Sequence, residues 1–206
     1  RQSGEFLELS GSYGFTFDKR NRSFMPSSGS IVTFNQSLPI YADKPFIDNT
    51  LATSLYYSFS ENYIGSSKFL ITAINGLNDE DVRVSKRKSL SSKRLRGFER
   101  GKVGPVDSDD HIGGNYAVAA NFDLSLPNFF PESTNTDVSL FLDFGNVWGV
   151  DYNKSIDDSN SIRSSTGLGI SWISPIGPMT FTFSQNLSKA STDKTESFNF
   201  NLGTTF

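Results

Sequence analysis

The sequence predicts an all-β fold, an antiparallel transmembrane β-barrel of which this chain supplies about nine strands. Apolar and polar residues alternate with a period close to two along most of the chain, which is the periodicity of a strand with two different faces. Most alternating segments reach the ~9–11 residues with which a strand crosses a membrane. The turns between them are short and long in alternation, as in outer-membrane barrels.

The N-terminal part of the chain holds four predicted strands, at about residues 7–18, 32–40, 50–59 and 68–77. In the first, the odd positions from Leu7 to Phe17 are mostly apolar and the even positions are mostly polar. A turn follows it, because Pro26 and Gly29 interrupt strands. The fourth segment is apolar on both faces, so its pattern does not assign its sides.

The C-terminal part holds five more predicted strands, at about residues 116–126, 137–148, 162–172, 179–187 and 197–206. A long irregular stretch, about residues 78–114, precedes them. Alternation is sharper here than before the long stretch; in the second of the five, Leu142 and Phe144 oppose Phe141 and Asp143. No segment has a helical period, and none approaches the roughly 18 consecutive apolar residues of a membrane helix.

Composition excludes several classes of function. The chain has no cysteine, which removes disulfide chemistry and thiolate metal sites. Its net charge of −3 provides no field that would attract nucleic acid. We therefore expect no nucleic-acid partner; the absence of a cofactor is an expectation that comes from the family resemblance described below.

Period-two strands also occur in soluble β-sandwiches and in lipocalin-like barrels. Strands in globular proteins usually run ~5–6 residues, and the segments here are longer. Aromatic residues near strand ends suit the girdle at a membrane interface; these are Tyr57, Phe59, Trp148, Trp172 and Phe206. The pattern favours a membrane barrel, although it does not say which face of the sheet points outward.

The last segment ends in an aromatic residue, which resembles the recognition signal of bacterial outer-membrane proteins. Phe198, Phe200, Leu202 and Phe206 share one face of this strand. An exposed edge strand offers unpaired backbone groups to which a second sheet edge can add. Gly203 is a predicted weak point, because glycine weakens a strand interior and permits a bend.

Several motifs together resemble the BamA family of assembly factors. The most specific is Arg96-Gly97-Phe98 in the long loop, followed by a Gly-Pro step and a Gly-Gly-Asn that opens a strand. The other matching segments are residues 24–29, 142–148, 162–163, 174–178 and 200–206. The resemblance covers most of the chain.

In that family the loop folds back into the barrel lumen, and its arginine docks on acidic and aromatic residues of two neighbouring strands. The matching positions here are Arg96 in the loop and Asp123, Phe141 and Asp143 on the wall. The last three fall on the polar face of their strands by periodicity alone. Guanidinium binds carboxylate as a fork and stacks on aromatic rings. The alternative is that Arg96 is one solvated charge among the basic residues of this loop.

The resemblance implies a function in the bacterial outer membrane, namely assembly and insertion of β-barrel proteins by strand templating at the barrel seam. Its implied partners are nascent outer-membrane proteins and lipoproteins of the BAM type. The basic residues of the long loop suggest a further partner, lipid or the phosphates of lipopolysaccharide. An antiparallel barrel needs an even number of strands or a parallel seam. We therefore expect one barrel domain over residues 1–206, as a fragment without the first strands and the periplasmic POTRA domains, or else a short relative.

Two other functions remain open. A polypeptide-translocating outer-membrane pore would share the Arg-Gly-Phe loop. A barrel enzyme would have to use His111 beside Asp109 and Asp110, and general-base catalysis would need a partner on another strand. Residues 97–102 are one residue short of a phosphate-binding loop, and Asp107 with its acidic neighbours is a weak calcium candidate. We expect no enzyme activity.

Overall fold

The computed structural model describes residues 5–23, 25–60, 63–126, 130, 134–156, 160–174 and 177–203. Within these ranges nine strands form one antiparallel sheet, in the order β1-β2-β3-β4-β7-β8-β9-β10-β11. The strands are β1 (Glu8–Asp18), β2 (Gly29–Ala42), β3 (Phe46–Ser58), β4 (Ile64–Gly76), β7 (Tyr116–Leu126), β8 (Thr136–Trp148), β9 (Arg163–Ser174), β10 (Gly177–Ser188) and β11 (Phe198–Leu202). The predicted antiparallel all-β fold is confirmed.

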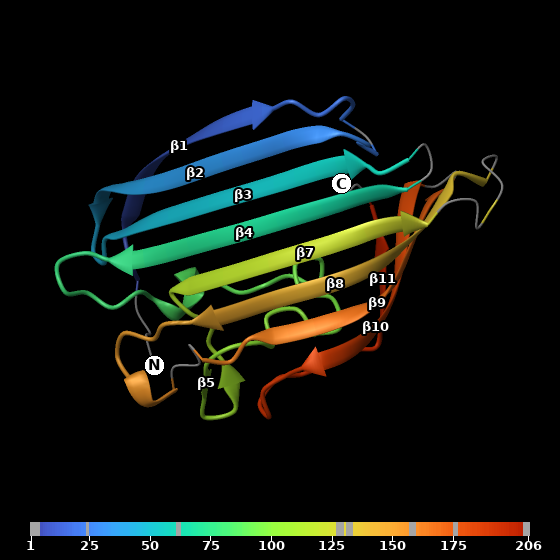
Figure 1. The fold of residues 1–206 in the computed structure, drawn as a ribbon. Coiled ribbons are helices and arrows are strands. Elements are labelled where there is room, and N and C mark those ends of the chain that lie inside the picture. Colours follow the sequence, from blue (N-terminus) through green and yellow to red (C-terminus); the bar gives the residue numbers. More distant parts are fainter. Residues whose placement is uncertain are drawn as a thin grey trace.

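The sheet is curved but open, with β1 and β11 as its two edges (Figure 1). Each strand pairs with its neighbour in sequence, except where the long loop separates β4 from β7. Among the described residues, no helix is long and apolar enough to cross a membrane.

The structure shows which face of the sheet is which. The large apolar side chains of alternating positions are exposed, among them Phe15, Ile71 and Leu140. We call this the outer face and the opposite one the inner face. Lipid-facing apolar residues that alternate with polar lumen residues are typical of a membrane barrel, whereas a soluble barrel would bury this set.

Strand β4, whose sides the sequence left open, is now assigned. Phe69 and Ile71 lie on the outer face and are exposed, whereas Thr72 and Ile74 are buried on the inner face. Leu70 packs against the buried cluster beneath the loop. The inner face of β4 is apolar at Leu70 because this residue meets the buried cluster, whereas Phe69 and Ile71 belong to the exposed apolar set of the outer face.

The last strand is shorter than predicted. Strand β11 ends at Leu202, and Gly203 lies just beyond it in a bend with φ +126°. Phe206 lies outside the described residues, as do Phe24, Pro175 and Ile176 of the turns that carried the family resemblance.

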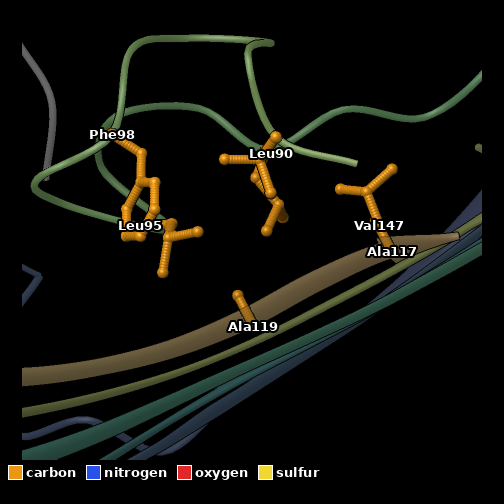
Figure 2. Packing of buried hydrophobic residues seen from close by; sticks show 7 residues of the cluster. Leu90, Leu95, Phe98, Ala117, Ala119 and Val147 are labelled. Carbon is orange, nitrogen blue, oxygen red and sulfur yellow. The ribbon is translucent and has the colours of Figure 1, made fainter. Parts of the chain in front are cut away.

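The loop between β4 and β7, residues 77–115, folds onto the inner face of the sheet (Figure 1). It contains the short helix η1 (Val84–Lys86) and the two-stranded pair β5 (Val106–Asp107) and β6 (Asp110–His111); another short helix, η3 (Lys154–Ile156), follows β8. Figure 2 shows Leu90, Leu95 and Phe98 reaching from the loop toward the strands. The predicted inward-folded loop is confirmed.

Small residues on the wall make room for this loop. Ala117 and Ala119 of β7 and Val147 of β8 complete the cluster with Leu90, Leu95, Phe98 and Val103. A methyl group on Gly145 would come within 2.8 Å of Leu90 Cδ1. Burial of one such Leu or Phe side chain contributes about 1.5–3 kcal/mol, so apolar packing holds the loop in addition to its polar contacts.

Candidate functional site

Arg96 lies at the centre of the contact between the loop and the wall. Its Nε donates to Asp143 Oδ2 at 2.7 Å and its Nη2 to Asp143 Oδ1 at 2.6 Å. Its Nη1 donates to Asp123 Oδ1 at 2.6 Å. The guanidinium carbon stands 3.8 Å from the centroid of the Phe141 ring. The structure thus brings together the four residues that the sequence singled out for docking.

The pairing of β7 with β8 creates this arrangement. Asp123 lies directly opposite Phe141, and Asp143 lies two residues further along β8 on the same face. Residues two apart on one strand point the same way, so one ring and two carboxylates surround a single guanidinium. Lys68 Nζ approaches Asp123 Oδ2 at 3.6 Å, which leaves two carboxylates facing two cations.

Gly97 lets the loop turn next to the wall. Its φ is +87°, a backbone conformation that costs an L-residue roughly 1–2 kcal/mol. A methyl group there would lie 3.1–3.3 Å from side-chain atoms of Asn186, Ser165 and Ser184. The Gly97 carbonyl accepts a hydrogen bond from Asn186 Nδ2 at 2.8 Å, and the carbonyl of Arg96 accepts one from the Ser165 hydroxyl.

Phe98 is almost fully buried, with 1% of its surface exposed, in the cluster between loop and sheet. The three residues of the motif therefore have different structural roles. Arg96 binds the wall through charge, Gly97 supplies the turn and Phe98 supplies apolar contact. Sequence reasoning did not identify the residues of β9 and β10 that receive the loop, namely Ser165 and Asn186.

The residues predicted at the seam lie on the terminal strand. Phe198, Phe200 and Leu202 are exposed on the outer face, and Phe200 and Phe198 face Phe181 and Phe183 across the β10–β11 pair. Gly203 lies past the strand end, where its N–H donates to the Pro178 carbonyl at 3.0 Å. The fifth predicted residue, Phe206, lies outside the described residues.

Backbone direction distinguishes the two edges of β11. Ser184 N–H donates to the Ser197 carbonyl, and Gly203 N–H donates to the Pro178 carbonyl. In an antiparallel ladder the N–H and C=O of one residue point to the same side, and the next residue points to the other. Asn199 and Asn201 therefore bond toward β10, while the backbone groups of Phe198, Phe200 and Leu202 point to the other edge. In the described part of the chain, no strand pairs with that edge.

The residues considered for catalysis have structural partners. The His111 ring nitrogen Nε2 lies 3.1 Å from the Thr192 carbonyl oxygen. The Tyr152 hydroxyl donates to Asp107 Oδ2 at 2.6 Å, and this bond, with a second from Ser108, lowers the pKa of Asp107. Within the described ranges, no three His, Cys, Asp or Glu residues are grouped as a metal site would require.

Comparison with known proteins identifies the family. Residues 1–206 match the model of the Omp85 superfamily domain. The outer membrane protein assembly factor BamA of Neorickettsia risticii is 28% identical over 200 residues, covering 95% of this chain and 27% of its own length. The sorting and assembly machinery component 50 homolog A of Xenopus laevis is 26% identical over 159 residues, covering 73% of this chain and 34% of its own length.

A solved structure has the same fold. The crystal structure of BamA from Haemophilus ducreyi lacking POTRA domains 1–3 matches with a TM-score of 0.86 and 26% identity, over 93% of this chain and 41% of that chain. This chain thus spans less than half the length of these relatives. The resemblance to the BamA family is confirmed, and the names of the bacterial relatives confirm the predicted outer-membrane location. With a family model that matches along its whole length, the chain belongs to the Omp85 superfamily.

Proposed function

We propose that this chain is the C-terminal part of a larger outer-membrane barrel that folds and inserts other β-barrel proteins. It forms a single barrel domain, and the first strands and periplasmic POTRA domains precede it in the intact protein. Two bacterial relatives are named outer membrane protein assembly factor BamA, and the Xenopus laevis relative is named sorting and assembly machinery component 50 homolog A. The reaction is non-covalent, requires no cofactor and has no catalytic residue.

The unpaired edge of β11 carries this proposal. Its outward backbone groups belong to Phe198, Phe200 and Leu202, whose side chains also lie on the apolar outer face. An unpaired edge is a template for strand addition, because each new backbone hydrogen bond satisfies a donor on one strand and an acceptor on the other. A nascent barrel strand is the partner that fits this edge, since it presents the same alternation.

The Arg-Gly-Phe loop supports the wall next to this edge. Arg96 ties the loop to β7 and β8, and the carbonyl of Gly97 accepts hydrogen bonds from Asn186 on β10 and from the backbone of Glu196. The loop therefore spans from the middle of the sheet to its terminal hairpin. We assign it the role of holding β8, β9 and β10 in one arrangement while β11 exchanges partners.

Other partners follow from the family and the location. Lipoproteins of the BAM type would bind the intact protein, and lipid or lipopolysaccharide would surround the outer face. The alternative function is a polypeptide-translocating pore. The docked loop does not separate the two functions, because such a pore would share the Arg-Gly-Phe loop.

A proline substitution tests templating directly. Phe200→Pro removes one outward N–H from the free edge and no N–H from the β10–β11 ladder, since the backbone N–H of Phe200 points away from β10. Phe200→Ala is the matched control for loss of the ring. The intact protein is placed in proteoliposomes with its partners, and the folding of an unfolded barrel substrate is followed by heat-modifiable gel mobility.

We expect Phe200→Pro to slow substrate folding well beyond Phe200→Ala, while the barrel itself keeps its own heat-modifiable mobility. Equal rates for the two variants would contradict templating at this edge. Loss of polypeptide transport with unchanged substrate folding would favour the pore instead.

A further inference from the structure

The first half of the long loop makes contacts of its own with the wall. We call residues 83–88 the foot of the loop; they include η1 and the basic residues Arg83, Lys86, Arg87 and Lys88. Lys86 N–H donates to the Arg83 carbonyl at 2.9 Å. In such a 3₁₀ turn, residues three apart lie on the same side. The turn therefore directs the Arg83 and Lys86 side chains toward one place on the wall.

That place is Glu8 on β1, whose side chain lies on the inner face because the next residue, Leu9, is exposed on the outer face. Glu8 Oε2 accepts a hydrogen bond from Arg83 Nη2 at 2.5 Å, and Glu8 Oε1 accepts one from Lys86 Nζ at 2.8 Å. The side chains of Arg83 and Glu8 are 14% and 17% exposed. One carboxylate thus binds two cations, and its low exposure limits the screening of this contact by salt.

Two aromatic rings complete the seat of the foot. The guanidinium carbon of Arg83 lies 4.7 Å from the centroid of the Phe6 ring. Lys86 Nζ lies 5.3 Å from the centroid of the Phe46 ring, at the start of β3. A cation is attracted to the face of an aromatic ring. Each of the two cations is therefore held by a ring as well as by the shared carboxylate.

The end of the foot is fixed to β3 and to the other end of the loop. Lys88 Nζ pairs with Asp48 of β3. Lys88 N–H donates to the Gly114 carbonyl at 2.7 Å, and Gly114 N–H donates to the Lys88 carbonyl at 3.0 Å. The wall partners of the foot lie on β1 and β3, whereas those of Arg96 lie on β7 and β8.

Further along, the loop reaches the strands near the opposite edge of the sheet. The Gly97 carbonyl accepts a hydrogen bond from Asn186 Nδ2 of β10 at 2.8 Å. Phe98 forms an antiparallel bridge with Thr195, which precedes β11. Because β1 and β11 are the two edge strands of this sheet, the loop spans the inner face from one edge strand to the residues that lead into the other.

We propose that Glu8 is a positioning residue for the loop: it fixes the foot on β1, so that the loop spans the sheet between two separate anchors, the foot and Arg96. This inference goes beyond the proposed function and rests on it for one consequence. If the loop holds the wall while β11 exchanges partners, release of the foot removes the support at the far edge and slows substrate folding.

Glu8→Gln tests the anchor, because it keeps the size of the side chain and leaves Arg83 and Lys86 without their shared counter-ion. The matched control is Glu5→Gln, since Glu5 is an exposed glutamate three positions earlier. Deuterium exchange is followed by mass spectrometry on the intact protein in lipid, in peptides that cover residues 83–88 and 94–98. The heat-modifiable mobility of each variant reports whether its barrel is folded.

Glu8→Gln should speed exchange in residues 83–88 by at least about tenfold, which is the lower end of the effect of a hydrogen bond to a charged group. It should leave residues 94–98 at the wild-type rate, because independent sites act separately. Glu5→Gln should change neither segment. A wild-type rate for residues 83–88 in Glu8→Gln would overturn the proposal. Equal acceleration of both segments would also overturn it, because the two anchors would then be one unit.

A double-mutant cycle tests whether the effect passes through the ion pair. Arg83→Gln should also speed exchange in the foot, and it serves in place of Glu8→Gln if that variant does not fold. The double variant should exchange no faster than Glu8→Gln alone, because the effects of residues that bind each other are not additive. Glu8→Asp keeps the charge and should exchange more slowly than Glu8→Gln. Additive effects, or no rescue by Glu8→Asp, would overturn the role of the carboxylate.

The consequence for assembly is measured on the same variants in proteoliposomes. Glu8→Gln should fold an unfolded barrel substrate more slowly than Glu5→Gln. Faster exchange in the foot together with unchanged substrate folding would overturn this consequence and leave Glu8 as an anchor of the loop alone. The exchange measurement involves no substrate, so failure of the anchor is distinguishable from failure of the assembly function, which the Phe200 variants test.

Discussion

Arg96 donates three hydrogen bonds to Asp143, from its backbone nitrogen at 3.0 Å, from Nε at 2.7 Å and from Nη2 at 2.6 Å. The Asp143 side chain has no exposed surface and that of Arg96 is 15% exposed. Because one carboxylate binds both the backbone and the guanidinium of the same residue, it fixes the path of the loop together with the rotamer of the arginine. The contact defines a single docked position.

Removal of the guanidinium should release the loop. Arg96→Ala leaves Asp143 buried without a counter-ion, at a cost of about 3–5 kcal/mol. We expect altered heat-modifiable mobility and protease cleavage within the loop. Arg100→Ala is the matched control, since Arg100 is an exposed basic residue four positions away. A variant at position 96 that keeps both wild-type mobility and wild-type protease protection would contradict the docking role.

Replacement of Gly97 by alanine separates backbone strain from crowding. Gly97 and Gly177 both have positive φ, at +87° and +124°, so alanine at either costs about 1–2 kcal/mol in conformation. At Gly97 the new methyl group also meets three side chains at 3.1–3.3 Å, whereas at Gly177 nothing lies within 4 Å. Gly97→Ala should therefore cost a further ~1–3 kcal/mol in urea unfolding of the intact barrel. Equal losses for the two variants would show that the wall accommodates the methyl group.

The sequence predicted most of the fold because apolar and polar residues alternate in every strand except β4. It also placed Asp123, Phe141 and Asp143 correctly on one face. Alternate residues share a face whatever the exact residue at which the strand begins, so errors in the predicted bounds do not change the assignment. The sides of β4 were not predictable. Leu70 is apolar on the inner face because it packs against the cluster that the loop forms with the wall, and the sequence of β4 alone does not show that a distant loop lies there.

Contacts between distant segments were missed for a related reason. Arg163 begins a predicted strand, yet its partner Asp193 lies 30 residues away in a turn. Turn residues have no periodicity that assigns them a direction. The pairing of residues 97–102 with 194–196 depends on the docked position of the loop, which only the whole fold determines.

Opposite faces of β8 should respond differently to a charge. Leu140 is exposed on the outer face, and Ser139 is its neighbour on the inner face. Arginine on the lipid face near the middle of a bilayer costs about 2–4 kcal/mol, whereas arginine on the inner face remains in a polar environment. We expect Leu140→Arg to lower the urea midpoint of the barrel in vesicles and Ser139→Arg to leave it nearly unchanged. The reverse order would mean that the assignment of the faces is wrong.

The contact between Asp107 and Tyr152 should depend on acid. The Tyr152 hydroxyl, 2.6 Å from Asp107 Oδ2, and then the Ser108 hydroxyl, 3.1 Å from Asp107 Oδ1, lower the pKa of Asp107 below its ordinary value of 3.8. A lowered carboxyl pKa means that the folded state favours the charged form. The stabilisation that the charged Asp107 contributes is then complete above pH 3.8 and is lost as the pH falls through the lowered pKa.

Tyr152→Phe removes the larger cause of the lowered Asp107 pKa and keeps a ring for the Arg87 guanidinium, which stands 5.1 Å from the ring centroid. A carboxyl NMR titration of the intact protein in lipid should show the pKa of Asp107 rising in Tyr152→Phe, and rising less in Ser108→Ala. If the pKa of Asp107 does not move in Tyr152→Phe, the hydrogen bond from Tyr152 is not the cause of the lowered pKa.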